Sequence, residues 1–387
     1  MSGKTYSQIE MIEKLVGFPT VSCDSNLPLV EFVRDYLSEW GIESHFVYNE
    51  EGNKANLWAT VGPNVEGGIV LSGHTDVVPV EGQAWVTDPW KVEQKDGKLY
   101  GRGTADMKSF SAIGLSLVPE MLNANLKRPI HFALSYDEEV ACLGAPDMIA
   151  DMGIKCPPAQ GVIVGEPTEM QTVTAHKAIA DIVTRIKGHE VHSSLVHTGV
   201  SAVMVAARLI TWWEDRMLAG AAKADPASLF NPPYSTFHCG QVQGGTAHNI
   251  TAKDCWFVTD IRTIPGETPH QHLDAYYEHL EKNVIPAMKA IHPDCDIETE
   301  IIADVAGLKP EDNGEAERFV RSITGDNGDH VVAYGTEGGQ FQEGGFSTVV
   351  CGPGSIEQAH QPNEYIDLSQ VEAGTDFLRK VISKCAA

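Results

Sequence analysis

The distribution of apolar and polar positions follows two different patterns along this chain. The first pattern, of continuous apolar runs separated by segments with helical spacing, predicts an α/β domain. Short continuous apolar runs, typical of buried strands, occur at residues 68–71, 129–136 and 161–164, each followed closely by histidine or acidic residues. Further strands are predicted at residues 46–48, 55–61 and 348–351. Helical spacing predicts helices at residues 7–16, 28–40, 107–123 (shortened or kinked by Pro119), 315–324 and 368–384. Strands and helices in this order indicate a mostly parallel sheet with its site along one edge.

The pattern changes near Lys177, where strands begin to alternate apolar and polar residues in the manner of a half-exposed sheet. The predicted order is strand 179–186, helix 201–217, strands 236–242 and 255–261, helix 269–289 and strand 297–304. This order suits an α+β insert of the ferredoxin-like kind. We therefore predict a catalytic domain made of residues 1–178 and 307–387, and an inserted domain made of residues 179–306.

Composition narrows the possible functions. The formal charge of −25 over 387 residues argues against a nucleic-acid partner, which requires a basic surface. We expect a cytoplasmic protein without membrane contact, because no apolar run is long enough to span a bilayer and the first residues lack an apolar signal core. The eight cysteines are scattered singly and are expected to be free thiols. A metal site must therefore be sought among His, Asp and Glu.

One candidate site begins where the predicted strand at 68–71 ends. His74 follows this strand, and Asp76 stands two residues later. Residues i and i+2 of extended backbone face the same side, so Asp76 can hold one ring nitrogen of His74 and leave the other for a metal. Taken alone, such a histidine is more often a surface residue in a polar turn.

Four further residues at strand ends, or in loops beside them, change this interpretation. Two imidazoles and three carboxylates form a nitrogen and oxygen donor set that suits divalent zinc, and one bridging carboxylate can hold two ions close together. The five candidate ligands are His74, Asp106, Glu139, Glu166 and His360.

The segments around these residues resemble the co-catalytic zinc aminoacylase and carboxypeptidase family, which includes acetylornithine deacetylases, succinyl-diaminopimelate desuccinylases and glutamate carboxypeptidases. The similarity spans essentially the whole chain. The matching segments are SGHTD at 72–76, GRGTADMK at 101–108, DEE at 137–139, GEPT at 165–168 and AHQPNE at 359–364.

The resemblance implies two zinc ions per subunit, although cobalt or manganese would accept the same ligands. His74, Asp106 and Glu166 would hold one ion, and Asp106, Glu139 and His360 the other, with Asp106 as the bridge. Asp76 would orient His74 from behind.

The family likeness also implies a proton carrier and a backbone feature. Glu138 would act as the general base, taking a proton from a metal-activated water and returning it to the departing amine. A cis peptide is expected at Asp106–Met107.

The inserted domain is expected to contribute residues to the site and to form a homodimer. Residues 188–194 resemble a family segment whose histidine reaches across the dimer interface, and His192 would polarise the scissile carbonyl. Asn249 and Arg262 match positions at which relatives contact the substrate, and an arginine fork suits a carboxylate.

The segment YGTEGG at residues 334–339 resembles the acetylornithine deacetylase form of a substrate loop. Gly335 and Thr336 would bind the substrate carboxylate. Glu337 would either pair with the ornithine ammonium or only brace the loop. Ala178 and Ala141 depart from the family pattern at positions that affect only hinge stiffness or packing.

The expected reaction is therefore hydrolysis of N2-acetyl-L-ornithine to acetate and ornithine, as in arginine biosynthesis. A desuccinylase, or another N-acyl amino acid or dipeptide hydrolase, would use the same metals and is the nearest alternative. A metal-free binding relative is the alternative from another class, but such relatives typically lose ligands or the base, and this chain keeps them.

Overall fold

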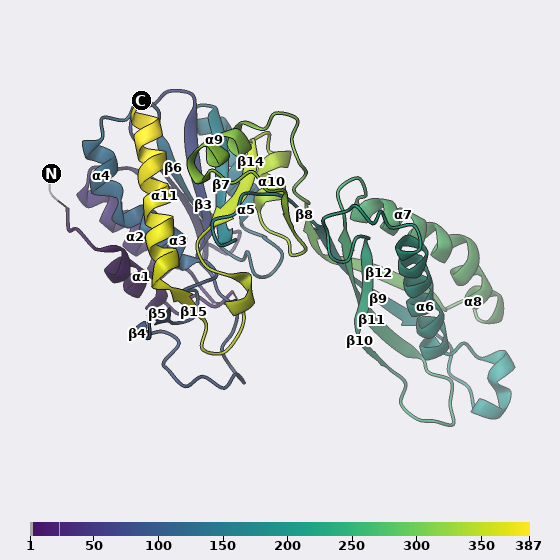
Figure 1. Cartoon of the computed structure of the whole chain (residues 1–387). Helices are drawn as coiled ribbons and strands as arrows, with labels where there is room; N and C mark the ends of the chain where they lie inside the picture. Colours follow the sequence, from purple (N-terminus) through teal and green to yellow (C-terminus); the bar gives the residue numbers. More distant parts are fainter. Residues whose placement is uncertain (1–2, 23) are drawn as a thin grey trace. The chain divides into compact units, whose positions relative to one another are not determined.

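The computed structural model describes residues 3–22 and 24–387, and it divides into two compact units (Figure 1). The first unit contains the described residues up to Ala175, together with Leu308–Val331 and Thr336–Ala387. The second unit contains His176–Gly307 and Val332–Gly335. The predicted insert of residues 179–306 falls inside the second unit, which also takes in residues 176–178, Gly307 and Val332–Gly335, all of which the prediction assigned to the catalytic domain.

A mixed eight-stranded sheet forms the centre of the first unit, in the order β1-β2-β6-β3-β7-β14-β8-β13. Neighbours are parallel from β6 through β3 and β7 to β14, whereas β1, β2 and β8 pair antiparallel with their neighbours. The strands are β1 (Ser44–Tyr48), β2 (Ala55–Val61), β3 (Gly68–His74), β6 (Ile130–Ser135), β7 (Ala159–Pro167), β8 (Val173–His176), β13 (His330–Val332) and β14 (Thr348–Gly352). The prediction of a mostly parallel α/β fold is confirmed.

The middle strand β3 explains why the site lies at one edge of this sheet. All seven of its residues are buried, as its apolar run predicted. His74 at its end stands opposite Ser135 of β6, and Ser72 stands opposite Val164 of β7. The carboxyl ends of these three parallel strands therefore meet at the same edge, where α/β sheets bind ligands.

Helices pack around this sheet, and most begin and end close to the predicted residues. Ser7 forms a capping box with Glu10 at the start of α1, and Pro119 lies at the beginning of α4, just after the break at Leu117. The sequence pattern did not predict α5, α10 or a small sheet of β15, β5 and β4. The helices are α1 (Gln8–Val16), α2 (Leu27–Glu39), α3 (Lys108–Ser116), α4 (Val118–Asn123), α5 (Ala145–Lys155), α9 (Glu315–Thr324), α10 (Gly338–Glu343) and α11 (Leu368–Ala386). The small sheet consists of β4 (Glu93–Lys95), β5 (Lys98–Tyr100) and β15 (Tyr365–Asp367).

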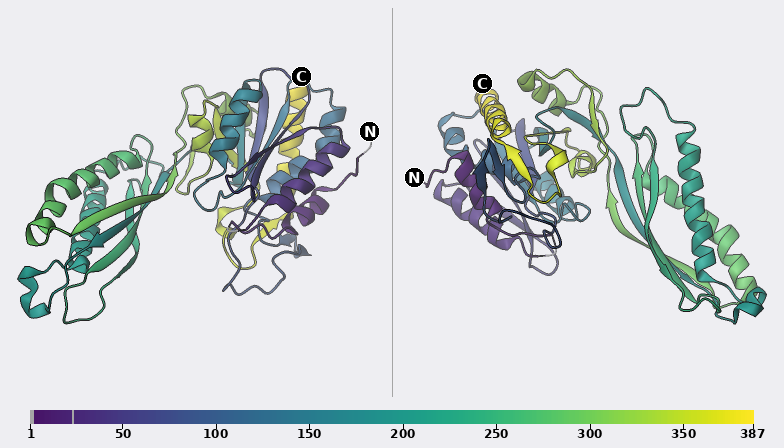
Figure 2. Two further views of the ribbon diagram at one scale, coloured as in Figure 1. Left: turned by 180° about the vertical axis from the view of Figure 1, so that it is seen from behind. Right: turned by 60° about the horizontal axis from the view of Figure 1, so that its bottom comes forward.

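The second unit is a four-stranded antiparallel sheet in the order β10-β11-β9-β12, with its helices on one face (Figure 2). Trp213 of α6, Tyr276 of α7 and Phe257 of β11 are fully buried in the core between them. The strands are β9 (Ala178–Lys187), β10 (Thr236–Gly244), β11 (Asp254–Thr263) and β12 (Asp296–Val305). The helices are η1 (Ser193–Thr198), α6 (Ala202–Ala221), α7 (Pro269–His279), η2 (Leu280–Val284) and α8 (Ile285–Ile291). The predicted ferredoxin-like insert is confirmed, although the helix expected at 269–289 is interrupted by the π turn η2.

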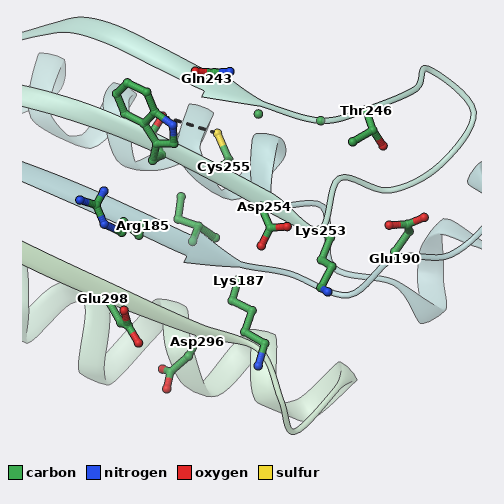
Figure 3. Close-up of a pocket in the computed structure, with 14 residues that line it drawn as sticks. Arg185, Lys187, Glu190, Gln243, Thr246, Lys253, Asp254, Cys255, Asp296 and Glu298 are labelled. Atoms are coloured by element: carbon green, nitrogen blue, oxygen red, sulfur yellow. Dashed lines mark hydrogen bonds between the residues drawn. The ribbon is translucent and has the colours of Figure 1, made fainter.

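The other face of this second sheet carries a pocket of about 500 Å³ (Figure 3). Arg185, Trp256 and Glu298 lie across neighbouring strands in its wall. None of the predicted metal ligands or the predicted base lines this pocket. Its wall mixes basic and acidic side chains rather than gathering one sign of charge.

Two further expectations concern cysteines and membranes. The seven cysteines that the structure describes are free, as predicted, and Cys23 lies outside the described residues. Over the described part of the chain, no helix combines the length and the apolar character that crossing a bilayer requires.

Candidate metal centre

The five predicted ligands come from five separate segments of the first unit. His74 ends β3, and Glu166 stands near the end of the neighbouring strand β7. Glu139 follows β6, and Asp106 lies just before α3. His360 is in the loop between η3 (Ile356–Gln358) and β15. The parallel register places the first three side by side, as the sequence pattern predicted.

Asp106 lies between the two imidazoles. Its Oδ1 is 3.0 Å from Nε2 of His74, and its Oδ2 is 3.4 Å from Nε2 of His360. The predicted cis peptide between Asp106 and Met107 is confirmed. One carboxylate thus presents its two oxygens to two different candidate ligands, which is the arrangement a bridging group requires.

Glu166 and Glu139 stand on either side of this bridge. Oε1 of Glu166 is 3.5 Å from Nε2 of His74, and Oε2 of Glu139 is 2.9 Å from Nε2 of His360. All five predicted ligands therefore lie in one cluster. Four of them are nine-tenths buried or more at the side chain, whereas the His360 side chain is 52% exposed.

Two buried oxygens in this cluster show that the residues fit a cation. Oε1 of Glu139 and Oε1 of Glu166 accept no hydrogen bond from the described residues. Buried carboxylate oxygens in folded proteins normally have a partner, so these two are placed for a group that binds oxygen. Within the described residues, His74, Asp106 and Glu139 offer donor atoms within 4.8 Å of one another, and so do His74, Glu138 and Glu166. These sets overlap the predicted ligand groups but include Glu138 and omit His360.

The charges of the cluster shift the proton affinities of its members. Hydrogen bonds to Asp106 and Glu139 raise the pKa of His360 to about 10, and burial, with the charge of Asp106, raises the pKa of Glu139 to about 7. Burial also raises the pKa of Glu166 well above its usual range. Although burial opposes it, hydrogen bonds from His360 and His74 hold the pKa of Asp106 below its usual range. Without an ion, the cluster therefore holds protons that a divalent cation would displace.

Asp76 differs in part from its predicted role. Nδ1 of His74 is 2.9 Å from the backbone carbonyl of Asp76 and 3.5 Å from its carboxylate. The carboxylate instead accepts the backbone amides of Glu138 (3.1 Å) and Glu139 (3.3 Å) and the hydroxyl of Ser22 (2.7 Å). Asp76 thus fixes the His74 tautomer mainly through its own carbonyl, and its side chain holds the turn that carries two glutamates.

Glu138, the predicted base, lies beside the cluster. Burial raises the pKa of Glu138 well above its usual range, and the neighbouring carboxylates of Glu139 and Asp106 add to this shift. The thiol of Cys142 lies 3.4 Å from Oε1 of Glu138. A carboxylate with raised proton affinity next to a candidate metal site has the properties of a general base and acid.

Sequence reasoning missed Arg102 and Glu364, which support the segment before Asp106. The guanidinium of Arg102 donates to Oε2 of Glu364 at 2.8 Å, and both side chains are buried. Oε1 of Glu364 accepts the backbone amides of Ala105 and Asp106 at 2.8 and 3.0 Å. Both residues stand inside segments that carried the family resemblance, and that was the signal that could have found them.

The buried carboxylate of Glu337 is held within the first unit. Its Oε1 accepts the hydroxyl of Ser72, and its Oε2 accepts the hydroxyl of Ser135 at 2.7 Å. Thr336 is fully buried, and its hydroxyl accepts the amide of Gly338 at 2.9 Å. Of the two roles considered for Glu337, these contacts favour bracing the loop.

Four other predicted residues, His192, Asn249, Arg262 and Gly335, belong to the second unit. The ring of His192 lies 2.8 Å from the Ser194 hydroxyl, and the carbonyl of Asn249 accepts the Ser193 amide at 2.8 Å. The guanidinium of Arg262 pairs with Asp260 at 3.1 Å. Their roles toward a substrate stay predictions.

Comparison with known proteins identifies the family to which this chain is similar. The model of peptidase family M20/M25/M40 matches residues 70–384. An acetylornithine deacetylase from Pasteurella multocida (strain Pm70) is 32% identical over 397 residues, covering 98% of this chain and 98% of the relative. An acetylornithine deacetylase from Myxococcus xanthus is 34% identical over 375 residues, covering 94% of each.

Solved structures show the same fold at lower identity. The M20 family metallo-carboxypeptidase Sso-CP2 from Sulfolobus solfataricus superposes with a TM-score of 0.77 at 15% identity, covering 99% of this chain and 100% of that chain. These matches and the cluster of carboxylates and imidazoles identify a metal-dependent amidohydrolase. The chain belongs to peptidase family M20/M25/M40.

Proposed function

We propose that the protein hydrolyses N2-acetyl-L-ornithine to acetate and L-ornithine, the reaction of a deacetylase in arginine biosynthesis. The observation that carries this proposal is the cluster around Asp106, in which two imidazoles and three carboxylates lie together and two buried carboxylate oxygens accept no hydrogen bond from the residues that the structure describes. Similarity to acetylornithine deacetylases over nearly the whole chain supports the choice of substrate.

Two divalent ions would be held by the five clustered residues, with zinc the best match for a mixed set of imidazole and carboxylate donors. His74 and Glu166 would hold one ion and Glu139 and His360 the other, with Asp106 shared. When bound, such ions lower the pKa of water and polarise the amide carbonyl.

Glu138 moves the proton in this proposal. Its carboxylate takes a proton from the attacking water and later delivers it to the nitrogen of the departing ornithine. The raised pKa of Glu138 favours both steps. A carboxylate with a higher proton affinity removes a proton from the water more readily and holds it until the amine departs. The Asp76 carboxylate holds the backbone at this position through the Glu138 amide.

The second unit would supply substrate contacts and the dimer interface. His192 of the partner subunit would donate to the developing oxyanion, and Arg262 with Asn249 would bind the α-carboxylate. Strand β10 lies at the edge of its sheet, and the exposed apolar side chains of Val242, Met204 and Leu218 lie on this strand and on α6. An unpaired edge strand beside exposed apolar residues supports homodimer formation through this unit.

Charge favours a cationic substrate. The formal charge of −25 would attract the ornithine ammonium. Backbone and hydroxyl groups of Gly335 and Thr336 would contact the substrate carboxylate. Glu337 would brace this loop through its two serine partners rather than pair with the ammonium.

A substrate panel tests the proposal. Purified, metal-replete protein is assayed with N2-acetyl-L-ornithine, N-succinyl-diaminopimelate, dipeptides and other N-acyl amino acids. The proposal predicts the highest kcat/KM with acetylornithine. Turnover of the succinylated substrate without turnover of acetylornithine would identify a desuccinylase instead, and the absence of hydrolysis across the panel would favour a binding protein.

A further inference from the structure

Lys54 makes contacts to two separate segments beside the metal centre. It stands immediately before β2, and its side chain is 12% exposed. Its ammonium donates to both carboxylate oxygens of Asp137, at 2.6 and 2.7 Å, and to the backbone carbonyl of Ser22. An ammonium has three N–H donors, so these three acceptors satisfy the group completely.

The first contact controls the start of the turn that carries the base. Asp137 directly precedes Glu138, which is followed by Glu139, and the Asp137 backbone has a φ of 53°. Residues other than glycine adopt this left-handed region infrequently, and surrounding contacts must then hold it in place. The bidentate grip of Lys54 on the Asp137 side chain is such a contact.

The second contact leads to the same turn from its other side. Ser22, whose carbonyl accepts from Lys54, donates its hydroxyl to Oδ2 of Asp76 at 2.7 Å. The Asp76 carboxylate in turn accepts the amides of Glu138 and Glu139. Lys54 therefore reaches the backbone of the two glutamates by two independent routes.

An ordinary surface ion pair would not have this effect, because exposed pairs contribute little to structure or stability. The Lys54 and Asp137 side chains are only 12% and 13% exposed. Neither residue belongs to the two sets of candidate metal donors. The hydrogen bonds of the Lys54 ammonium go to Asp137 and Ser22, so its effect on the geometry of the cluster passes through these two residues.

We propose that Lys54 is a positioning residue that fixes the carboxylates of Glu138 and Glu139 relative to the metal centre. This inference rests on the proposed function for its catalytic part. Loss of the ammonium would release Asp137 and the Ser22 carbonyl together. The base and one metal ligand would then move while the substrate contacts remain.

The test compares Lys54→Met, Lys54→Arg and the control Lys155→Met, all purified as the full chain. Lys155 pairs with Asp151 at 2.7 Å on α5 and has a 51% exposed side chain, so its loss removes an ion pair away from the cluster. Three quantities are measured: zinc affinity of the metal-free protein, kcat and KM at saturating zinc, and the melting temperature.

For Lys54→Met we expect zinc affinity to fall by about 10–100-fold, the usual effect of removing a group that orients metal ligands. We expect kcat to fall by about 100-fold, because small misplacement of a catalytic group has effects of this order, with KM close to that of the parent. Lys54→Arg should recover most of both losses, since a guanidinium can also grip a carboxylate through two hydrogen bonds. Lys155→Met should change neither quantity.

Parental zinc affinity and kcat in Lys54→Met would overturn the proposal, whatever its melting temperature. Equal losses in Lys54→Arg and Lys54→Met would also overturn it, because the ion pair would then not be what positions the turn. If Lys54→Met does not fold, Asp137→Asn replaces it. The proposal then requires that kcat of Asp137→Asn falls while KM stays close to that of the parent. If the parent hydrolyses none of the substrates, the proposed function fails, and the zinc affinities still decide the role of Lys54.

Discussion

The two units of this protein use acidic side chains in opposite ways. In the first unit, Asp106, Glu139 and Glu166 are buried beside imidazoles, and two of their oxygens accept no hydrogen bond from the described residues. In the second unit, Glu298 and Glu300 of β12 are exposed on the open sheet face, and Glu300 pairs with Arg185 while both side chains remain at least half exposed. Unmet hydrogen bonding alone does not distinguish the proposed ligands, because a buried oxygen of Asp181 in the second unit also accepts no hydrogen bond from the described residues. What distinguishes Asp106, Glu139 and Glu166 is that they are buried together beside imidazoles, whereas the charged residues of the pocket in the second unit are not.

The largest expected effect comes from the proposed base. Glu138→Gln keeps the shape of the side chain but cannot accept a proton, so kcat should fall by about 10²–10⁴-fold. The matched change Glu298→Gln, in the pocket of the second unit, should leave kcat unaltered. Steady-state kinetics with acetylornithine measures both. If Glu138→Gln and Glu298→Gln had comparable kcat values, Glu138 would not be the base, and the two units would not differ in how they use their glutamates.

The second contrast concerns stability and compares two arginine–glutamate pairs. Arg102→Met leaves the fully buried carboxylate of Glu364 without its cation, and breaking such a pair costs about 3–5 kcal/mol of unfolding free energy. Arg185→Met breaks an exposed pair in the second unit, which should cost about 0–1 kcal/mol. Denaturant unfolding of each variant and the parent measures the difference. Similar losses in both variants would contradict the structural distinction between the pairs.

The third contrast concerns pH and metal affinity. Ligands must lose their protons before a metal binds. The pKa values of about 10 for His360 and about 7 for Glu139 mean that His360 carries a proton up to about pH 10 and Glu139 up to about pH 7. Zinc affinity should therefore rise with pH between pH 7 and 10, by at least about tenfold per unit because the pKa values of His74 and Glu166 are also raised, and more steeply below pH 7, where Glu139 adds a further proton.

Calorimetry in buffers of different ionisation enthalpy measures the protons released. Substituting His360 with alanine should remove one released proton across the range. Zinc affinity that does not change between pH 6 and 8 would show that the clustered groups do not bind the metal.

Local patterns were enough to predict the elements that position the site. The apolar run of β3 identified a buried strand, and the acidic or histidine residues at or just after the ends of β6, β3 and β7 identified the edge at which these strands meet. The family resemblance added the ligand set and the cis peptide at Asp106–Met107, both of which agree with the observed cluster.

Contacts between distant segments could not be read from these patterns. Glu364 lies 258 residues from Asp106 along the chain, yet it accepts the backbone amide of Asp106. The Asp76 carboxylate reaches the amides of Glu138 and Glu139 because β3, which ends at His74, lies beside β6 in the sheet. Such contacts depend on the folded register, which no local run of residues encodes.

The central claim is that the cluster around Asp106 binds two metal ions, and counting bound ions tests it most directly. Metal-free protein is titrated with zinc, and the number of ions bound per chain is compared between the parent and Asp106→Asn. Because Asp106 is proposed to contact both ions, the parent should bind about two ions per chain and the variant should lose high affinity for both. A parent that binds no zinc, or a variant that still binds two ions with parental affinity, would contradict the account.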